Sequence, residues 1–170
     1  MQPTNQGKYT VTHSPPVSPE AITLRELAPE ETFCIYPLIT RHNPTVTEAV
    51  FHTVLPGMVA QGYRALAAFH DDRMVGVSGF WLRNRFWCGK QLDIDNFFVE
   101  PDYRGAGIGA RIVEWMDAKA VAEGCQLIVL DTYIDSFLSH RFYHRAGFIT
   151  TGFHFTKIPG SATPFERVRR

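Results

Sequence analysis

Apolar and polar positions alternate along several parts of the chain with the period of β-strands. Two long apolar runs are separated only by Asp71 and Asp72, which is the pattern of an antiparallel hairpin. The last run of this group ends at Pro101, a residue that cannot donate to a sheet ladder. The strands predicted in this part cover residues 21–27, 63–70, 73–87 and 90–100.

Four other segments are predicted to be helices, from their start and stop signals and, for the third, from apolar residues at helical spacing. They cover residues 29–40, 43–62, 108–123 and 135–148. Pro56 lies inside the second segment and predicts a kink or a break into two pieces. Gly124 and Gly147 are placed to end the last two helices, because glycine readily adopts the left-handed cap conformation.

Two more strands are predicted near the C-terminus. Residues 126–132 form a continuous apolar run of the kind found in buried strands, and residues 148–158 alternate as a returning strand. The predicted order is one strand, two helices, a three-stranded meander, then helix, strand, helix and strand. This order favours an α+β (mixed α/β) fold, with one mostly antiparallel sheet and helices packed against it.

At 170 residues the chain suits one domain over residues 20–170, preceded by a polar arm over residues 1–19. The arm has no apolar core that could serve as a signal peptide, and no apolar run is long enough to span a membrane. Lys plus Arg and Asp plus Glu both number 17, so the charge balance indicates neither nucleic acid nor an anionic membrane as a partner. The 3 cysteines argue against a disulfide framework and favour a cytoplasmic location.

A glycine-rich loop follows the fourth predicted strand in the stretch "FFVEPDYRGAGIGARIVEWM", residues 97–116. A tight turn, a dinucleotide-binding fingerprint and a diphosphate cradle are the competing interpretations. The fingerprint places its first glycine directly after a strand, whereas "EPDYR" intervenes here, although Asp131 ends a later strand where a ribose-binding acid could lie. No G-x-x-x-x-G-K-[ST] motif occurs, which excludes a P-loop.

The diphosphate cradle is compatible with a tight turn. Backbone N–H groups unobstructed by side chains can converge on an anion where the 108–123 helix begins, and the helix dipole favours negative charge there. Arg104, directly before the glycines, can add a charge-assisted contact.

Two motifs then identify a family. The pattern V-x-P-x-Y-R-G-x-G-I-G, Val99 to Gly109, resembles the acetyl-CoA signature of the Gcn5-related N-acetyltransferases (GNATs). The stretch "SFLSHRFYHRAGF", residues 136–148, resembles the family's second signature, with Ser136 in place of the usual Asn and Ser139 in place of a frequent Ala. The resemblance covers about residues 21–158, and implies a sheet with a splayed strand pair flanked by about four helices.

The resemblance also implies acetyl-CoA as cosubstrate and a set of residues that bind it. A three-residue step from Ile94 to Phe97 breaks strict alternation and predicts a bulge, which in the family frees backbone N–H groups for the acetyl carbonyl and the pantetheine. The residues implied are Phe97, Phe98, Val99, Arg104, Gly105, Ala106, Gly107, Ile108, Gly109, Ala110, Ser136, Ser139 and Tyr143.

Helical spacing places Ser136, Ser139, His140 and Tyr143 on one face, which is expected to look toward the cofactor while Leu138 and Phe142 pack inward. Tyr143 matches the tyrosine that the family places beside the CoA sulfur as general acid; a purely structural role is the alternative.

Asp93 and Asp95 are the candidates for a general base. Asp93 stands where some histone-modifying members carry a Glu. Either carboxylate could instead cap a turn or pair with a neighbouring cation, because many members deprotonate the amine through waters and backbone carbonyls. His140 and His144 lack the Glu of H-E-x-x-H and a third ligand, so no metal site is expected.

The sequence therefore predicts an acetyl-CoA-dependent N-acetyltransferase that acts on a primary amine, first of all that of a small molecule, by direct attack in a ternary complex. A protein lysine or N-terminus is the alternative acceptor. A CoA-binding sensor module without turnover is the alternative of another class. A homodimer, formed through the C-terminal strand or the arm, is a further expectation.

Overall fold

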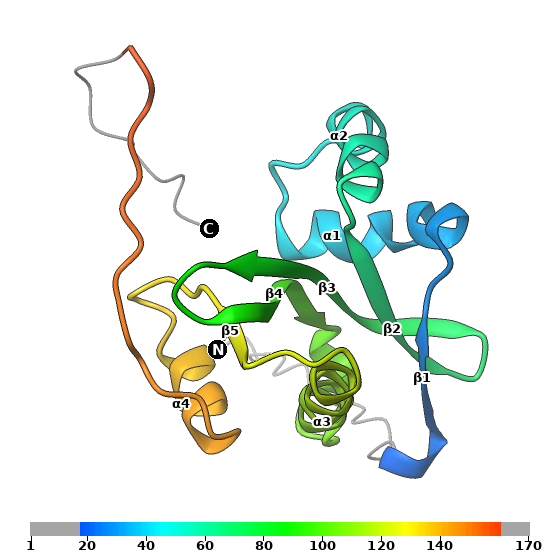
Figure 1. The fold of residues 1–170 in the computed structure, drawn as a ribbon. Coiled ribbons are helices and arrows are strands. Elements are labelled where there is room, and N and C mark those ends of the chain that lie inside the picture. Colours follow the sequence, from blue (N-terminus) through cyan, green and yellow to red (C-terminus); the bar gives the residue numbers. More distant parts are fainter. Residues whose placement is uncertain (1–17, 161–170) are drawn as a thin grey trace, which may run out of the picture.

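The computed structural model describes residues 18–160, in which a five-stranded sheet lies between helices (Figure 1). The strand order is β1-β2-β3-β4-β5, with antiparallel pairing up to β4 and parallel pairing between β4 and β5. The α+β fold and the antiparallel meander are thus confirmed. Most of the predicted arm lies outside the described residues. The strands are β1 Ile22–Glu26, β2 Arg64–His70, β3 Arg73–Arg85, β4 Gly89–Val99 and β5 Leu127–Leu130.

The helices agree with the predicted segments except in two details. The first predicted helix begins as the 3-10 helix η2, and the second is one continuous helix, α2, that contains Pro56. Of the two outcomes predicted for Pro56, a kink or a break, the break was therefore wrong, and the kink stays a prediction. The carbonyl that Pro56 leaves without a donor belongs to His52, an exposed residue, so water can satisfy it. The helices are η1 Pro19–Ala21, η2 Pro29–Ile35, α1 Tyr36–His42, α2 Glu48–Ala60, η3 Pro101–Tyr103, α3 Ile108–Ala122 and α4 Phe137–Arg145.

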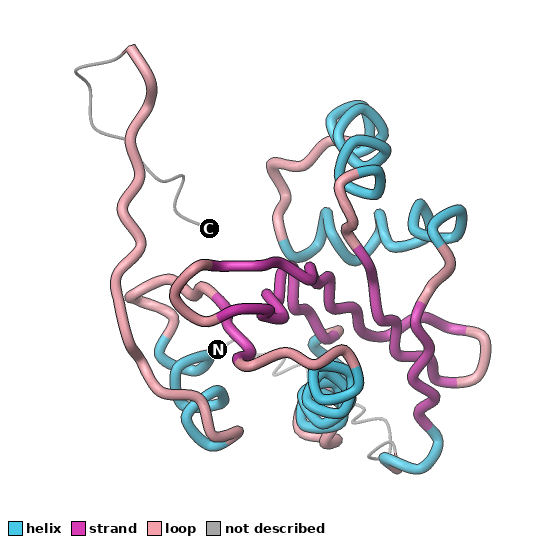
Figure 2. The backbone as a smooth tube through the Cα atoms, viewed as in Figure 1, coloured by secondary structure: helices cyan, strands magenta, loops and turns pink. Residues whose placement is uncertain are grey.

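The sheet separates two hydrophobic cores, because successive strand residues point to opposite faces. Along β2, Ala65 and Ala67 face one core and Leu66 and Ala68 face the other. Figure 2 shows α1 and α2 on one side of the strands and α3 on the other. The first core, on the α1/α2 side, includes Leu38, Phe51 and Leu55, and the second core, on the α3 side, includes Ile108, Ile112 and Met116.

A β-bulge lies in β4 at the predicted position. Asn96 has a φ of 50°, and the pairing with β3 shifts register between Val77 and Gly79. On its other edge β4 pairs with β5 only as far as Ile94 and Leu130. Beyond that point, within residues 18–160, β4 remains paired with β3 but has no strand on its β5 side. This arrangement confirms the predicted bulge and the splayed strand pair.

A buried aromatic pair supports the bulge from the first core. Tyr63 is 3% exposed, and its ring meets that of Trp81 edge-on at 5.3 Å between centroids. The Tyr63 hydroxyl hydrogen-bonds with Asn96, and Trp81 Nε1 donates to Asp95 Oδ2 over 3.5 Å. Gly79 provides the space for the Tyr63 ring, because a Cβ at this position would lie 2.2 Å from the Tyr63 hydroxyl oxygen.

An ion network fixes the end of α3 against the sheet. Glu123 follows the helix, and its carboxylate lies 3.0 Å from Lys90 Nζ on β4 and 3.3 Å from Arg64 Nη1 on β2. The hydrogen bond from Lys90 is the main reason that the pKa of Glu123 is lowered to about 2, with Lys119 and Arg64 contributing. Because α3 is held at this end, the position of its first turn relative to β4 is also constrained.

The part of the chain after α3 departs most from prediction. The strand expected over residues 126–132 is limited to β5, and all of its residues are partly or fully exposed, so it is not of the buried type. The strand expected over residues 148–158 is absent: this segment pairs with no strand among the described residues, and Phe153 and Phe155 are 81% and 89% exposed. The segment has strand-like alternation, but within residues 18–160 it does not pair with the outer edge of β5, which is also unpaired.

The three cysteines, Cys34, Cys88 and Cys125, are all free thiols. Within residues 18–160 no helix has both the length and the apolar character required to cross a bilayer.

Replacing Gly79 with Ala is expected to destabilise the protein by about 1–3 kcal/mol, because the new methyl group would force the buried Tyr63 ring to move. Denaturant unfolding measures the effect. Gly57→Ala is the matched control: Gly57 is an exposed α2 residue with nothing within 4 Å of its Cβ position, so alanine there is expected to stabilise by about 0.5–1 kcal/mol. Equal effects of the two substitutions would contradict the close contact at Gly79.

Candidate active site

Each of the three glycines in the loop before α3 is needed for a different structural reason. Gly105 and Gly107 have φ values of 82° and 77°, a conformation that glycine adopts without strain. Gly107 is also the N-cap of α3. Gly109 lies inside the first turn of the helix, where a Cβ would be only 3.1 Å from Cζ of Phe142 on α4. The first two glycines therefore shape the loop, and the third allows α4 to approach.

The first turn of α3 offers backbone donors that the helix does not use. The helical hydrogen bonds start with Arg111 N–H donating to the Gly107 carbonyl over 3.1 Å, so the N–H groups of residues 108–110 have no partner within the helix. A Cβ placed at Gly105 would meet nothing within 4 Å, so the loop is open on that side. Converging donors at a helix N-terminus fit the diphosphate of a nucleotide cofactor.

Arg104 is oriented by the end of β4. Its Nε donates to the Val99 carbonyl over 3.0 Å, and its guanidinium lies over the Phe98 ring, 5.7 Å from the centroid. The side chain lines a cavity of about 410 Å³ together with Arg41, which pairs with the buried Glu100. The predicted contact of Arg104 with an anion stays a prediction.

Helix α4 rests on the bulged part of β4 and on α3. The Phe97 ring lies 5.7 Å from that of Phe142 and 6.0 Å from that of Tyr143. Tyr143 also meets Phe148 at 5.7 Å between centroids. Burial among these aromatic rings raises the pKa of Tyr143 to about 12, so at neutral pH its hydroxyl is protonated and can donate a proton.

The side of α4 that was predicted to look toward the cofactor is half-buried. Its residues Ser136, Ser139, His140 and Tyr143 are all partly buried. Phe142 also packs toward the body of the fold, as expected. Leu138 does not: it is 83% exposed, so its predicted inward packing is wrong. The reason is that no element of the described chain covers that side of this short helix. The Ser136 hydroxyl does not cap α4, which leaves it free for a ligand.

Asp93 lies on the face of β4 that is turned toward the first core, because its neighbours Leu92 and Ile94 belong to the second core. Its carboxylate is 3.5 Å from Arg83 Nη1 on β3. Burial raises the pKa of Asp93; the positive charge of Arg83 opposes this shift, and the nearby carboxylates of Asp131 and Asp95 reinforce it. A carboxylate with a raised pKa is a stronger base than an ordinary one.

The candidate acid and base therefore lie on opposite faces of the sheet. Tyr143 approaches β4 through Phe97, which packs against the second core, whereas Asp93 faces the first core. Between them is the edge of β4 that has no strand beside it after Ile94. A molecule inserted at this edge would meet the backbone of residues 97–99 and could be reached from both faces.

The histidines on α4 are engaged by the backbone. His140 Nε2 lies 2.8 Å from the Tyr133 carbonyl, and His144 Nδ1 lies 3.0 Å from the Phe148 carbonyl. Among residues 18–160 no three His, Cys, Asp or Glu side chains are grouped so that they could hold a metal ion.

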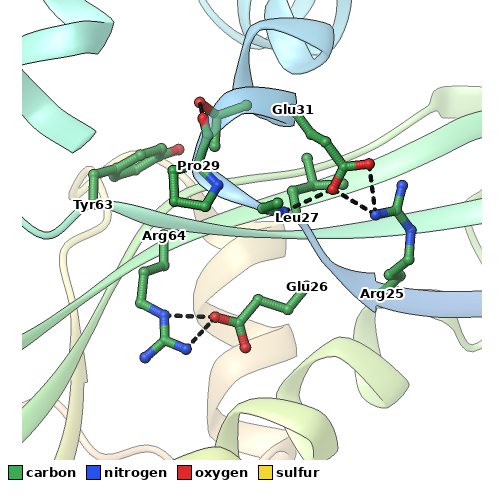
Figure 3. A pocket seen from close by; sticks show the side chains of 9 residues that line it. Arg25, Glu26, Leu27, Pro29, Glu31, Tyr63 and Arg64 are labelled. Carbon is green, nitrogen blue, oxygen red and sulfur yellow. Dashed lines mark hydrogen bonds and ion pairs between the residues drawn. The ribbon is translucent and has the colours of Figure 1, made fainter.

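A cavity of about 590 Å³ lies at the ends of β1 and β2, apart from the glycine loop (Figure 3). Its charged side chains neutralise one another: Arg25 pairs with Glu31 at 2.7 Å, and Arg64 pairs with Glu26. None of its lining residues belongs to the glycine loop, to β4 or to α4, so the open edge of β4 is the better candidate site.

Sequence reasoning missed Tyr63, Asn96 and Gly79, which hold the bulge in place. The broken alternation located the bulge but not the residue with positive φ. Asn96 was the available signal, because Asn tolerates the left-handed conformation better than other residues with a side chain. Nothing local in the sequence pairs Tyr63 with Gly79, which are joined only by strand register.

Comparison with known proteins agrees with this geometry. The model of the acetyltransferase (GNAT) family matches residues 24–148, most of the chain. Among curated proteins, the aminoalkylphosphonate N-acetyltransferase of Salmonella typhimurium is 29% identical over 140 residues, which are 79% of this chain and 89% of that protein. The aminoglycoside N(6')-acetyltransferase type 1 of Stenotrophomonas maltophilia is 24% identical over 54% of this chain and 63% of its own length.

Solved structures share the fold. An aminoglycoside N-acetyltransferase in complex with CoA has a TM-score of 0.72 at 15% identity, covering 82% of this chain and 95% of its own. The glucosamine-6-phosphate N-acetyltransferase of Arabidopsis thaliana has a TM-score of 0.63 at 18% identity, covering 81% of this chain and 98% of its own. With the family match over most of its length, this chain belongs to the GNAT family and is an acetyl-CoA-dependent acetyltransferase.

Proposed function

We propose that the protein transfers an acetyl group from acetyl-CoA to the primary amine of a small molecule, by direct attack in a ternary complex. The observation that carries this proposal is the open edge of β4, with a diphosphate cradle at one end and Asp93 and Tyr143 on its two faces. Acetyl-CoA supplies the activated acetyl thioester when bound. Everything else in the reaction is assigned to residues of this chain.

The loop of residues 104–110 binds the diphosphate through the N–H groups at the start of α3. The N–H groups of Phe97 and Val99 hold the acetyl carbonyl and the pantetheine along the open edge, and stabilise negative charge as it develops on the carbonyl oxygen. The N–H of Phe98 points to β3 instead, because backbone groups alternate along a strand and Glu100 N–H donates to the Val75 carbonyl. The hydroxyls of Ser136 and Ser139, on the half-buried side of α4, contact the pantetheine arm.

Two proton transfers accompany the exchange of bonds. A free alkylamine has a pKa of about 10 and must lose a proton to become a nucleophile. In the proposed mechanism that proton passes to solvent before the attack, and Asp93 takes a second proton from the nitrogen as the nitrogen bonds to the acetyl carbon and the carbon–sulfur bond breaks. Tyr143 gives its proton to the departing sulfur.

The acceptor side favours a cationic small molecule. Asp93, Asp95 and Asp131 lie close enough to influence one another electrostatically. Arg83 and Arg85 offset part of their negative charge, and the remainder attracts a positively charged amine. Two relatives that match over more than half of this chain are named for aminoalkylphosphonates and aminoglycosides, which are small amines. A protein lysine or N-terminus is the alternative acceptor.

An amine panel tests the proposal through release of the CoA thiol. The panel contains an aminoalkylphosphonate, an aminoglycoside, an amino sugar phosphate, a lysine analogue and a lysine-containing peptide. We expect amine-dependent thiol release with at least one small amine and little with the peptide. Binding of CoA without turnover on any amine would support the sensor module instead, and turnover on the peptide alone would support a protein acceptor.

Asp93→Asn is expected to lower kcat/KM about 100-fold or more, because the amide cannot accept the amine proton. The raised pKa of Asp93 moves the acidic limb of the wild-type pH–rate profile to higher pH than an unperturbed aspartate would give, and the substitution removes this limb. Burial disfavours the ionised form of Asp93 in the folded state, so the wild type loses stability as pH rises through the folded pKa of this group. Asparagine carries no charge, so the variant should avoid this loss and should be no less stable than the wild type at neutral pH.

Asp95→Asn is the matched control on the same strand, because an asparagine oxygen can still accept the hydrogen bond from Trp81 Nε1. Its expected loss of kcat/KM is less than about 10-fold. Equal losses in the two variants would show that Asp93 is not the base.

Tyr143→Phe is expected to lower kcat by about 10- to 100-fold while leaving KM for acetyl-CoA nearly unchanged. The phenyl ring keeps the packing with Phe97, Phe142 and Phe148, and only the proton donor is lost. Steady-state kinetics separate the two effects. Tyr103→Phe removes a hydroxyl that contacts His70 instead, and serves as control. An unchanged kcat in the Tyr143 variant would assign this tyrosine a structural role.

A further inference from the structure

Charged side chains lie along the outer part of the β3–β4 hairpin, on the sheet face that is turned toward the first core. Trp81 belongs to that core, so Arg83 and Arg85, at the next alternate positions of β3, point to the same face. Asp93 on β4 lies on this face too, and the sheet register places it directly opposite Trp81. Figure 1 shows that the closed end of this hairpin extends away from α1 and α2. Two arginines therefore stand on the solvent side of the candidate base.

The Arg83 guanidinium is held in place by its neighbours but is not fully used by them. It lies over the Trp81 ring, 4.5 Å from the centroid, which limits how it can turn. Its Nη1 is 3.5 Å from Asp93 Oδ2, longer than the about 2.7–2.9 Å of a charge-assisted hydrogen bond. The Arg83 side chain is also 41% exposed. Arg83 thus neutralises part of the charge of Asp93 and has N–H donors left for a second acid.

Arg85 has no acid of its own chain beside it. Its cross-strand neighbour on β4 is Gly89, which has no side chain, and no ion pair within residues 18–160 includes Arg85. The residue is exposed, yet its positive charge still acts on Asp93. Neutralisation of the neighbouring carboxylates explains Arg83 but does not require a second arginine opposite a glycine.

The charges on this face are separated along the hairpin. Arg85 and Arg83 lie toward its closed end, whereas Asp93 and Asp95 lie toward the part of β4 that leaves β5. Trp81 lies between the two groups, because its ring carries Arg83 and its Nε1 donates to Asp95. A surface that is positive at one end and negative at the other is complementary to a ligand with both charges.

We propose that the acceptor is a short zwitterion, a primary amine that also carries a carboxylate, phosphonate or phosphate group, and that Arg83 and Arg85 bind this acid while the amine lies at Asp93. The inference rests on the function proposed above and names its substrate class. Arginine fits the paired oxygens of such an acid with two parallel N–H groups. Because Arg83 and Asp93 are themselves in contact, the two charges of the ligand are only a few bonds apart. Binding at both ends fixes the direction of the nitrogen before it attacks.

Two pairs of amines test the proposal, each pair differing only in the acid. The first is 2-aminoethylphosphonate and its diethyl ester, and the second is β-alanine and its amide. At saturating acetyl-CoA, kcat/KM of the acid should exceed that of its neutral partner by about 10-fold or more in at least one pair. The pair with the larger ratio identifies the acid. Turnover with ratios near one in both pairs would overturn the zwitterion and leave the proposed function standing, whereas no turnover of any small amine would overturn both.

Arg85→Gln removes the charge and keeps a polar side chain on an exposed residue, so circular dichroism should show the variant folded. The ratio between the acid and its neutral partner should fall about 10-fold, and Arg85→Lys should retain most of it. Arg25→Gln is the matched control, because Arg25 is an exposed arginine at the other edge of the sheet, on β1, and its substitution should leave the ratio as in the wild type. Equal losses of kcat/KM for both members of a pair in Arg85→Gln would overturn the assigned contact.

A binding measurement tests the same contact without catalysis. Ethylphosphonate and propionate keep the acids of the two pairs and lack the amine. An NMR titration of the protein with CoA bound should show binding of the acid that the kinetic ratios identify, with a Kd about 10-fold weaker in Arg85→Gln and in Arg83→Gln. An unchanged Kd in both variants, or no binding to the wild type, would overturn the proposal.

Discussion

The architecture of the site depends on one extra residue in β4. Between the pairs Val77–Phe98 and Gly79–Asp95, β4 advances by one residue more than β3, and Asn96 absorbs the difference with a positive φ. A side-chain residue in this conformation costs about 1–2 kcal/mol. The buried Tyr63–Trp81 pair contributes about 0.5–1.5 kcal/mol, and a hydrogen bond to Asn96 about as much again, so these contacts offset the strain. The bulge is therefore stable, and β4 can leave β5 beyond Ile94 while staying joined to β3.

The elements that sequence alone predicted well are those set by local chemistry. The hairpin at Asp71, the glycine caps at Gly124 and Gly147 and the bulge after Ile94 each follow from a few neighbouring residues, and the structure has all of them. The glycine loop was predictable for the same reason, because positive φ and a helix N-terminus leave a local signature. Its family motif then implied the cofactor, which geometry on its own did not name.

Features that depend on distant partners were not predictable in the same way. Alternation over residues 148–158 indicated a strand, but a strand also requires a paired neighbour, and within residues 18–160 this segment has none. Leu138 has the spacing of a buried residue and is exposed because nothing in the described chain lies against it. Gly79 was indistinguishable from an ordinary strand glycine until register placed the Tyr63 ring over it. In each case the local pattern does not specify the distant partner on which the outcome depends.

In the proposed mechanism, the cofactor lies on one face of the sheet and the general base for the amine on the other. The residues that bind the cofactor and those that bind the acceptor can therefore vary separately. The cradle, α3 and α4 belong to the side of the second core, where Gly109 and Phe142 set how closely the helices approach. Asp93 faces the other side, which α1 and α2 cover. A substitution on α1 or α2 can therefore alter the space for the amine without touching the backbone donors of the cradle. β4 contributes to both proposed binding sites, so its bulge must be retained whatever the acceptor is.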